Sequence, residues 1–124
     1  MNWKLVPLTA ALLCASAGAA HTQMACLVEG KMMGEQIKDC SQTSLPLPAA
    51  DYAAQCKESG SVFAASGGSG GASVLKACPP QAQGSCVGPF GQPMSTFYYA
   101  RSPEQLAATK SSCAAQKGKW IDKP

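Results

Sequence analysis

CKESGSVF at residues 56–63 and CAAQKGKW at residues 113–120 point to the fold, because they carry one pattern twice. In each stretch a cysteine is followed by a glycine and then, seven residues after the cysteine, by an aromatic residue. A further cysteine lies upstream of each stretch, Cys26 before the first and Cys86 before the second. The recurrence predicts two similar units that disulfide bonds hold together, with chance recurrence of common residue types as the alternative.

The first 20 residues have the three parts of an export signal. Lys4 gives a positive start, residues 5–14 are mostly apolar, and residues 15–20 are small. The apolar stretch is shorter than the roughly 20 residues that a membrane-spanning helix needs. We therefore expect residues 1–20 to be a signal peptide, with a buried N-terminal helix as the alternative. Cleavage is expected after Gly18, Ala19 or Ala20, and the mature chain is expected to be secreted or periplasmic, with no transmembrane segment.

The cysteine count supports an oxidising compartment. The chain has seven cysteines, and loss of Cys14 with the leader leaves six. A lipid-anchored Cys14 is disfavoured because the bulky Leu13 precedes it. An even number of cysteines in a short exported chain indicates disulfide bonds. A zinc site would need closely spaced pairs such as C-x2-C, and the nearest cysteines, Cys78 and Cys86, are eight apart.

Symmetry between the units predicts how the cysteines pair. Six cysteines allow 15 pairings. If each unit joins its first strand to its helix, two of the bonds are Cys26–Cys56 and Cys86–Cys113. Cys40 and Cys78 then pair with each other and tie the units together. A local Cys78–Cys86 bond is the main alternative.

The expected fold class is α+β, a small disulfide-rich domain of two tandem ββα-like units. The first unit covers residues 21–65 and the second covers residues 78–124. Residues 66–77 begin with SGGSGG and have the composition of a flexible Gly/Ser-rich linker. They lack the lysine and hydroxyl pattern of a phosphate-binding loop.

Local signals place the elements within each unit. In the first unit we expect a hairpin turning at residues 29–30, a helix over residues 49–58 that stops at Gly60, and a strand over residues 61–65. In the second we expect a strand over residues 94–100 and a final strand over residues 119–121. Between them, Ser102, Pro103 and Gln105 form the start of a helix that ends at Gly118.

Composition argues against several functions. The net charge is only +3, and the lysines are scattered, so a nucleic-acid partner is not expected. The single histidine, His21, lies beside the expected cleavage point, which leaves a Ser–His or Cys–His pair without a firmly placed base. The seven carboxylates show no recognisable paired spacing. We therefore expect a protein that is not an enzyme and that carries no cofactor.

His21 has one alternative role. Cleavage near it would place the histidine at or close to a free amine, and this combination chelates Cu(II). A periplasmic copper binder that acts through its mature N-terminus is therefore one alternative function.

The favoured interpretation is an exported binding protein with a protein partner in the envelope or outside the cell. A small inhibitor or an immunity-type protein of a bacterial envelope would belong to this class, and a structural or surface-associated envelope module is the other alternative. Aromatic residues in the second unit are the candidate partner-binding residues: Phe90, Tyr98 and Tyr99. Alternation along a strand puts Tyr98 and Tyr99 on opposite faces.

Overall fold

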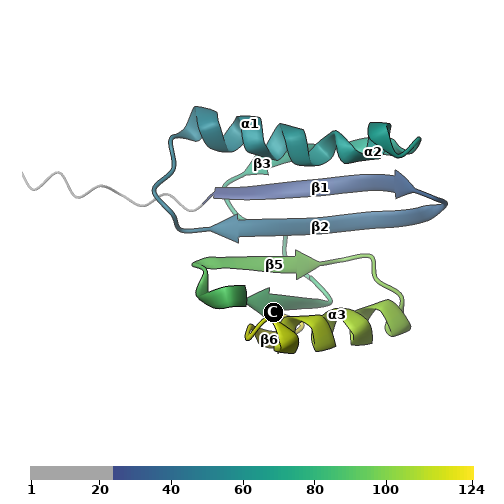
Figure 1. Ribbon diagram of the computed structural model, residues 1–124, viewed down its shortest axis with the longest axis vertical. Helices are drawn as coiled ribbons and strands as arrows, with labels where there is room; N and C mark the ends of the chain where they lie inside the picture. The colour runs from purple at the N-terminus through teal and green to yellow at the C-terminus, as the bar shows by residue number, and fades with distance from the viewer. Residues whose placement is uncertain (1–23) are drawn as a thin grey trace, which may run out of the picture.

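The computed structural model describes residues 24–124. The expected signal peptide, its cleavage point and His21 lie outside the described residues. Within residues 24–124 the chain forms an antiparallel six-stranded sheet in the order β3-β1-β2-β5-β4-β6 (Figure 1). The strands are β1 (Met24–Met32), β2 (Glu35–Thr43), β3 (Ser69–Leu75), β4 (Gly84–Val87), β5 (Met94–Tyr98) and β6 (Lys119–Asp122). The helices are α1 (Ala49–Gly60), α2 (Val62–Ala65), α3 (Pro103–Ala115) and the 3-10 turn η1 (Pro89–Gly91).

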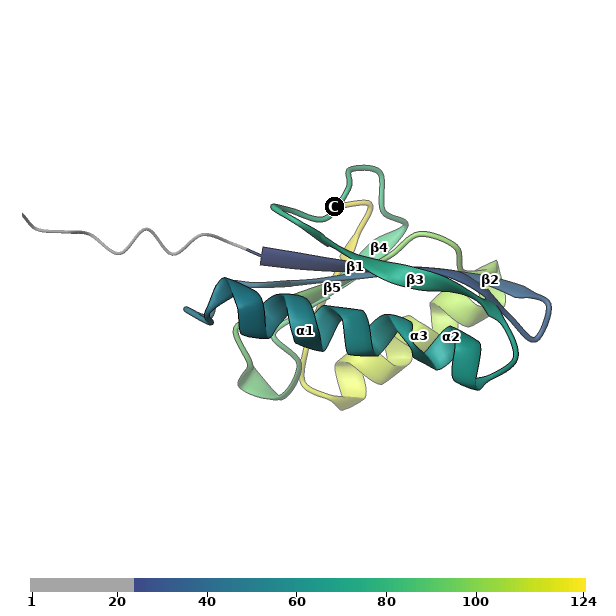
Figure 2. The same ribbon diagram turned by 90° about the horizontal axis from the view of Figure 1, so that it is seen from above.

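The two longer helices lie on the same face of the sheet. Figure 2 shows α1 and α3 below the strands and the connection between β3 and β4 above them. This connection, residues 76–83, crosses the face that the helices leave uncovered, and we call it the strap. The molecule is therefore mostly sheet, with helices on one side, which agrees with the α+β class only in part.

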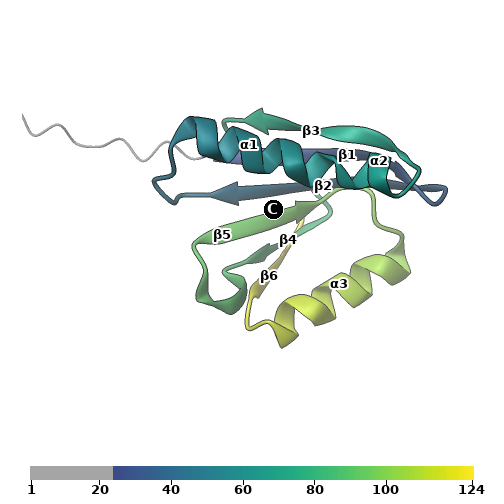
Figure 3. The same cartoon turned by 45° about the horizontal axis from the view of Figure 1, so that its top comes forward.

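The chain has two halves with the same order of elements. The first half runs β1-β2-α1-β3 and the second runs β4-β5-α3-β6, apart from the short α2 and η1. In each half, the strand after the helix lies beside the first strand of that half, and β2 and β5 pair where the halves meet (Figure 3). Both halves therefore contribute to one continuous sheet.

The described residues form three disulfide bonds, and the symmetric scheme is confirmed. Cys26 in β1 bonds to Cys56 in α1, and Cys86 in β4 bonds to Cys113 in α3. The third bond joins Cys40 of β2 to Cys78 of the strap, so a local Cys78–Cys86 bond is excluded. Each half thus has its helix covalently attached to its own first strand.

The core is thin, and cysteines make up much of it. The buried apolar residues include five half-cystines, and Phe63 and Tyr52 are the large side chains among them. A core of this size supplies little of the free energy of folding, so the crosslinks have to supply a large share.

The prediction of a flexible linker over residues 66–77 is wrong for most of that stretch. Ser69–Leu75 forms β3, which pairs with β1 from Leu75 opposite Ala25 to Ser69 opposite Lys31. Gly68 and Gly70 are needed for space, because a Cβ would lie 2.1 Å from the Lys31 carbonyl oxygen and 2.5 Å from the Glu29 carbonyl oxygen, respectively. A Cβ on Gly60 would lie 2.6 Å from the Ala72 nitrogen, so α1 rests directly on the backbone of β3.

Two other local expectations in the first half are also wrong. The hairpin turns at Met33 and Gly34, where both residues have positive φ, as a two-residue hairpin requires. Gly30 is instead a strand residue with β3 pressed against it. Residues 62–65 form α2 instead of a strand, because the chain needs a further helical turn to bury Phe63 before it reaches the edge of the sheet.

The predicted start and end of the helix in the second half are confirmed. The glycine after the helix, Gly118, is needed for a reason other than its backbone conformation. Ser102 caps α3 and forms a capping box with Gln105. The left-handed residue after the helix is Lys117, with φ 59°, rather than Gly118. Gly118 is required for space, because its Cβ would lie 2.6 Å from the Cys86 sulfur and 2.8 Å from the Cys113 sulfur.

Candidate binding surface

The loop between β4 and β5 has a fixed and unusual backbone. Gly88, Phe90 and Gly91 all have positive φ, and Phe90 has φ 56°. Backbone hydrogen bonds hold the loop at both ends: the Gly88 amide donates to the Met94 carbonyl at 2.9 Å, and the Phe90 amide donates to the Gln116 carbonyl at 2.8 Å. The second bond fastens the loop to the end of α3.

Phe90 has an unfavourable backbone conformation, and its side chain gains no compensating burial. Its side chain is 71% exposed. A left-handed conformation costs a residue with a side chain about 1–2 kcal/mol, and it is rare for a bulky residue. Burial of the ring within this chain does not offset that cost. Strain of this kind, held by surrounding structure, is typical of functional positions.

An apolar pocket lies beside the loop, with a volume of about 290 Å³. Its apolar wall comes from the connector before α1, from α1 itself and from the end of the loop: Leu45, Leu47, Tyr52, Pro93 and Met94. The rest of the lining is uncharged, from Ser41, Gln42, Thr43, Gln55 and Gln92. Small-molecule sites usually have about 300–1,000 Å³, so this pocket lies at the lower limit of that range. It has room for a single large side chain. An uncharged lining suits an apolar group.

Tyr98 lies in a different place, in a polar groove of about 340 Å³ between α3 and the sheet. The groove is lined by Tyr98, Arg101, Gln105, Thr109, Ser112 and Gln116, over the Cys86–Cys113 bond. The Arg101 guanidinium lies over the Tyr98 ring, 5.1 Å from its centre, and bonds Asp39 Oδ2 at 2.7 Å. Partial burial raises the pKa of Asp39, and the nearby Arg101 charge offsets only part of this rise.

Trp120, the aromatic residue that ends the second cysteine–glycine–aromatic stretch, is a neighbour of Tyr98. The two rings stack, with centres 5.9 Å apart and planes 22° from parallel. Gly84 of β4 pairs with Tyr98 of β5, and a Cβ on Gly84 would lie 2.1 Å from the Trp120 ring. Pairing of β4 with both β5 and β6 would have revealed this stack, but local sequence does not show that pairing.

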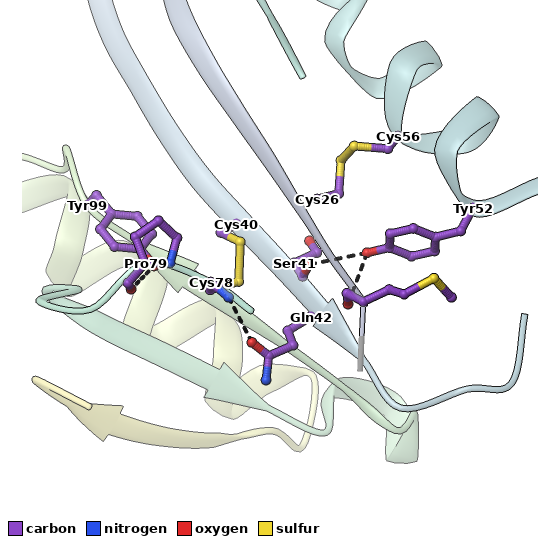
Figure 4. The surroundings of a disulfide bond; sticks show 10 residues. Cys26, Cys40, Ser41, Gln42, Tyr52, Cys56, Cys78, Pro79 and Tyr99 are labelled. Atoms are coloured by element: carbon purple, nitrogen blue, oxygen red, sulfur yellow. Dashed lines mark hydrogen bonds between the residues drawn. A yellow bond between two sulfur atoms is a disulfide. The ribbon is translucent and has the colours of Figure 1, made fainter. Parts of the chain in front are cut away.

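Tyr99 lies on the opposite face, under the strap. Its hydroxyl donates to the Pro79 carbonyl at 2.6 Å, next to the Cys40–Cys78 bond (Figure 4). The Cys78 amide donates to Gln42 Oε1 at 2.9 Å in the same region. Burial raises the pKa of the Tyr99 hydroxyl. Phe90, Tyr98 and Tyr99 therefore occupy three separate places, and they do not form one surface.

The described part of the chain holds no cluster of metal-ligating side chains. Among residues 24–124, no three His, Cys, Asp or Glu side chains lie together as metal ligands would. The same residues contain no helix of the length and apolar character needed to span a bilayer.

The comparisons give no relative from which a role could be transferred. No family model, curated protein or solved structure matches this chain.

Proposed function

We propose that this chain is an exported, non-enzymatic protein that binds a protein partner through residues 88–93 and the adjacent apolar pocket. The observation that carries the proposal is Phe90, an exposed phenylalanine held in a left-handed conformation by a hydrogen-bonded loop. A rigid aromatic group loses little conformational entropy when a partner covers it. Aromatic residues, phenylalanine among them, are enriched in the cores of protein–protein interfaces.

The disulfide bonds support the exported part of the proposal. Three of them in a domain with a thin core fit an oxidising compartment, where such bonds persist. The shared element order and the matching bonds also support the idea that the halves are tandem copies of one ββα-like unit.

Within the class of inhibitors, the loop disfavours imitation of a protease substrate. Peptides that bind along a sheet edge or a cleft do so in an extended conformation. Phe90 has φ 56° and the loop is tightly turned, so its backbone does not present an extended strand. We therefore favour a partner that receives the Phe90 side chain in a pocket and places an apolar side chain of its own in the pocket of this chain.

The experiment compares Phe90→Gly with Met33→Gly. Met33 is a matched control because it is also an exposed apolar residue with positive φ, 90% exposed at the hairpin turn. Each substitution relieves a left-handed residue, so each should raise the free energy of unfolding by up to about 1 kcal/mol. Only Phe90→Gly should lose the partner captured from the native envelope and extracellular fractions by the wild-type chain.

Leu47→Lys, which charges the apolar pocket, is a second test of the same surface. It should lower capture of that partner at least tenfold, about 1.4 kcal/mol of binding free energy. Equal capture by wild type, Phe90→Gly and Leu47→Lys would show that binding occurs elsewhere. Equal loss in Met33→Gly would show that the loss is not specific to this loop.

A further inference from the structure

We propose that the outer edge of β3 pairs antiparallel with the β3 edge of a second copy of this chain, so that two sheets join into one. Within the described residues β3 pairs only with β1, on its inner side. The outer side therefore presents backbone N–H and C=O groups that another strand can bond.

The two edges of the sheet differ in protection. β6 is four residues long, carries Lys119 and Asp122, and is followed by Lys123 and Pro124. Short length, charge and proline are the usual means of preventing a sheet edge from pairing. β3 has seven residues, SGGASVL, without charge or proline. The sequence thus blocks association at one edge and leaves the other edge open.

Apolar side chains are exposed at the open edge. Val74 of β3 is 45% exposed, and Val62 of α2, a helix that contacts β3, is 46% exposed. Together they are two of the six large apolar side chains exposed in residues 24–124. A second strand at this edge would cover apolar surface in addition to satisfying backbone groups.

The β3 sequence is complementary to itself in side-chain size. In an antiparallel pair centred on Ala72, Val74 of one copy lies opposite Gly70 of the other, and Leu75 lies opposite Ser69. Each larger side chain therefore meets a small one, and no charges face each other. A two-fold axis through Ala72 makes the contact identical from both sides, which closes the assembly as a dimer. This complementarity favours a second copy over an unrelated peptide.

The test is the sedimentation of the oxidised mature chain over a range of concentrations. The wild type should show a reversible monomer–dimer equilibrium. Ser73→Lys places a charge beside the proposed contact, on the face of β3 that points away from α1, where Ser73 is exposed, and should weaken the dimer at least tenfold. Ile121→Lys makes the same change on β6 and should leave the dimer unchanged. Phe90→Ala should also leave it unchanged, which separates this proposal from the proposed partner site.

Each variant is checked for native far-UV circular dichroism and for the absence of free thiols. If Ser73→Lys does not fold, Val74→Thr keeps a β-branched shape and should weaken the dimer severalfold by removing apolar contact. A wild-type chain that stays monomeric up to about 1 mM would overturn the proposal. So would growth into large species, which indicates pairing of β3 with β6, or an equal effect of Ile121→Lys.

Discussion

The two halves have the same element order, but their helices are held in different ways. α1 buries Tyr52, Cys56 and Gly60 against β1 and β3, while α3 buries Cys113, all within the described residues. Position by position, Thr109 stands four residues before Cys113, where the first half has Tyr52 four residues before Cys56. The polar groove lies where the second half lacks the large ring. One topology can therefore hold a helix by packing together with a disulfide bond, or by the bond almost alone.

The largest expected effects come from removing one helix bond at a time. The loops closed by Cys26–Cys56 and Cys86–Cys113 have similar separations, 30 and 27 residues, so loss of either bond should lower the free energy of unfolding by about 3–4 kcal/mol. The local results should differ. In Cys86→Ala/Cys113→Ala, the α3 amides should lose hydrogen-exchange protection, because little other packing holds that helix. In Cys26→Ala/Cys56→Ala, α1 should keep most of its protection. Equal loss in both helices would contradict the comparison.

Tyr52 is expected to have the next largest effect. Tyr52→Ala removes a buried ring whose hydroxyl donates weakly to the Met24 and Ser41 carbonyls, and it should lower the free energy of unfolding by about 3 kcal/mol. Thr109→Ala is the matched change in α3 and should have an effect within about 0.5 kcal/mol. Urea denaturation of both variants measures the difference. A loss at Thr109 as large as that at Tyr52 would mean that α3 packs as tightly as α1.

The smallest expected effect is at Ser85, which precedes Cys86 as Ala25 precedes Cys26. Both residues are almost completely buried, but the Ser85 hydroxyl has no hydrogen-bond partner within the described residues. An unpaired buried hydroxyl is unfavourable, so Ser85→Ala should raise the free energy of unfolding by about 1 kcal/mol. Thermal denaturation provides the measurement, with Ser95→Ala in the half-exposed part of β5 as control. A decrease at Ser85 would show that the hydroxyl does have a partner.

Sequence alone predicts the role of a residue when its partner is set by a local rule or by the similarity of the two halves. The helix start at Ser102 depends on Gln105 three residues later, and both were found. The disulfide pairs followed from matching one half to the other, and the remaining two cysteines had no other partner.

The errors occurred where a distant segment decides the role of a residue. The turn expected at Gly30 is wrong, because β3 lies against this glycine within a strand. The helix ends expected near Gly60 and Gly118 are confirmed, but these glycines are needed because another backbone or a sulfur atom lies against them and not for a left-handed conformation. The composition of β3 is that of a linker, and only its pairing with β1 makes it a strand. Phe90, Tyr98 and Tyr99 were identified as candidates, but their separation depends on which face each strand and loop presents.

The arrangement of the three disulfide bonds determines what a single proteolytic cut does to the chain. A single break in the backbone anywhere between Cys26 and Cys78, or between Cys86 and Cys113, leaves the two pieces covalently joined. Between Cys26 and Cys113, only a break between Cys78 and Cys86 separates the halves. That stretch is PPQAQGS, with two prolines and without lysine, arginine or any aromatic residue. The one vulnerable connection in this region is thus made of residues that trypsin-like and chymotrypsin-like proteases do not recognise.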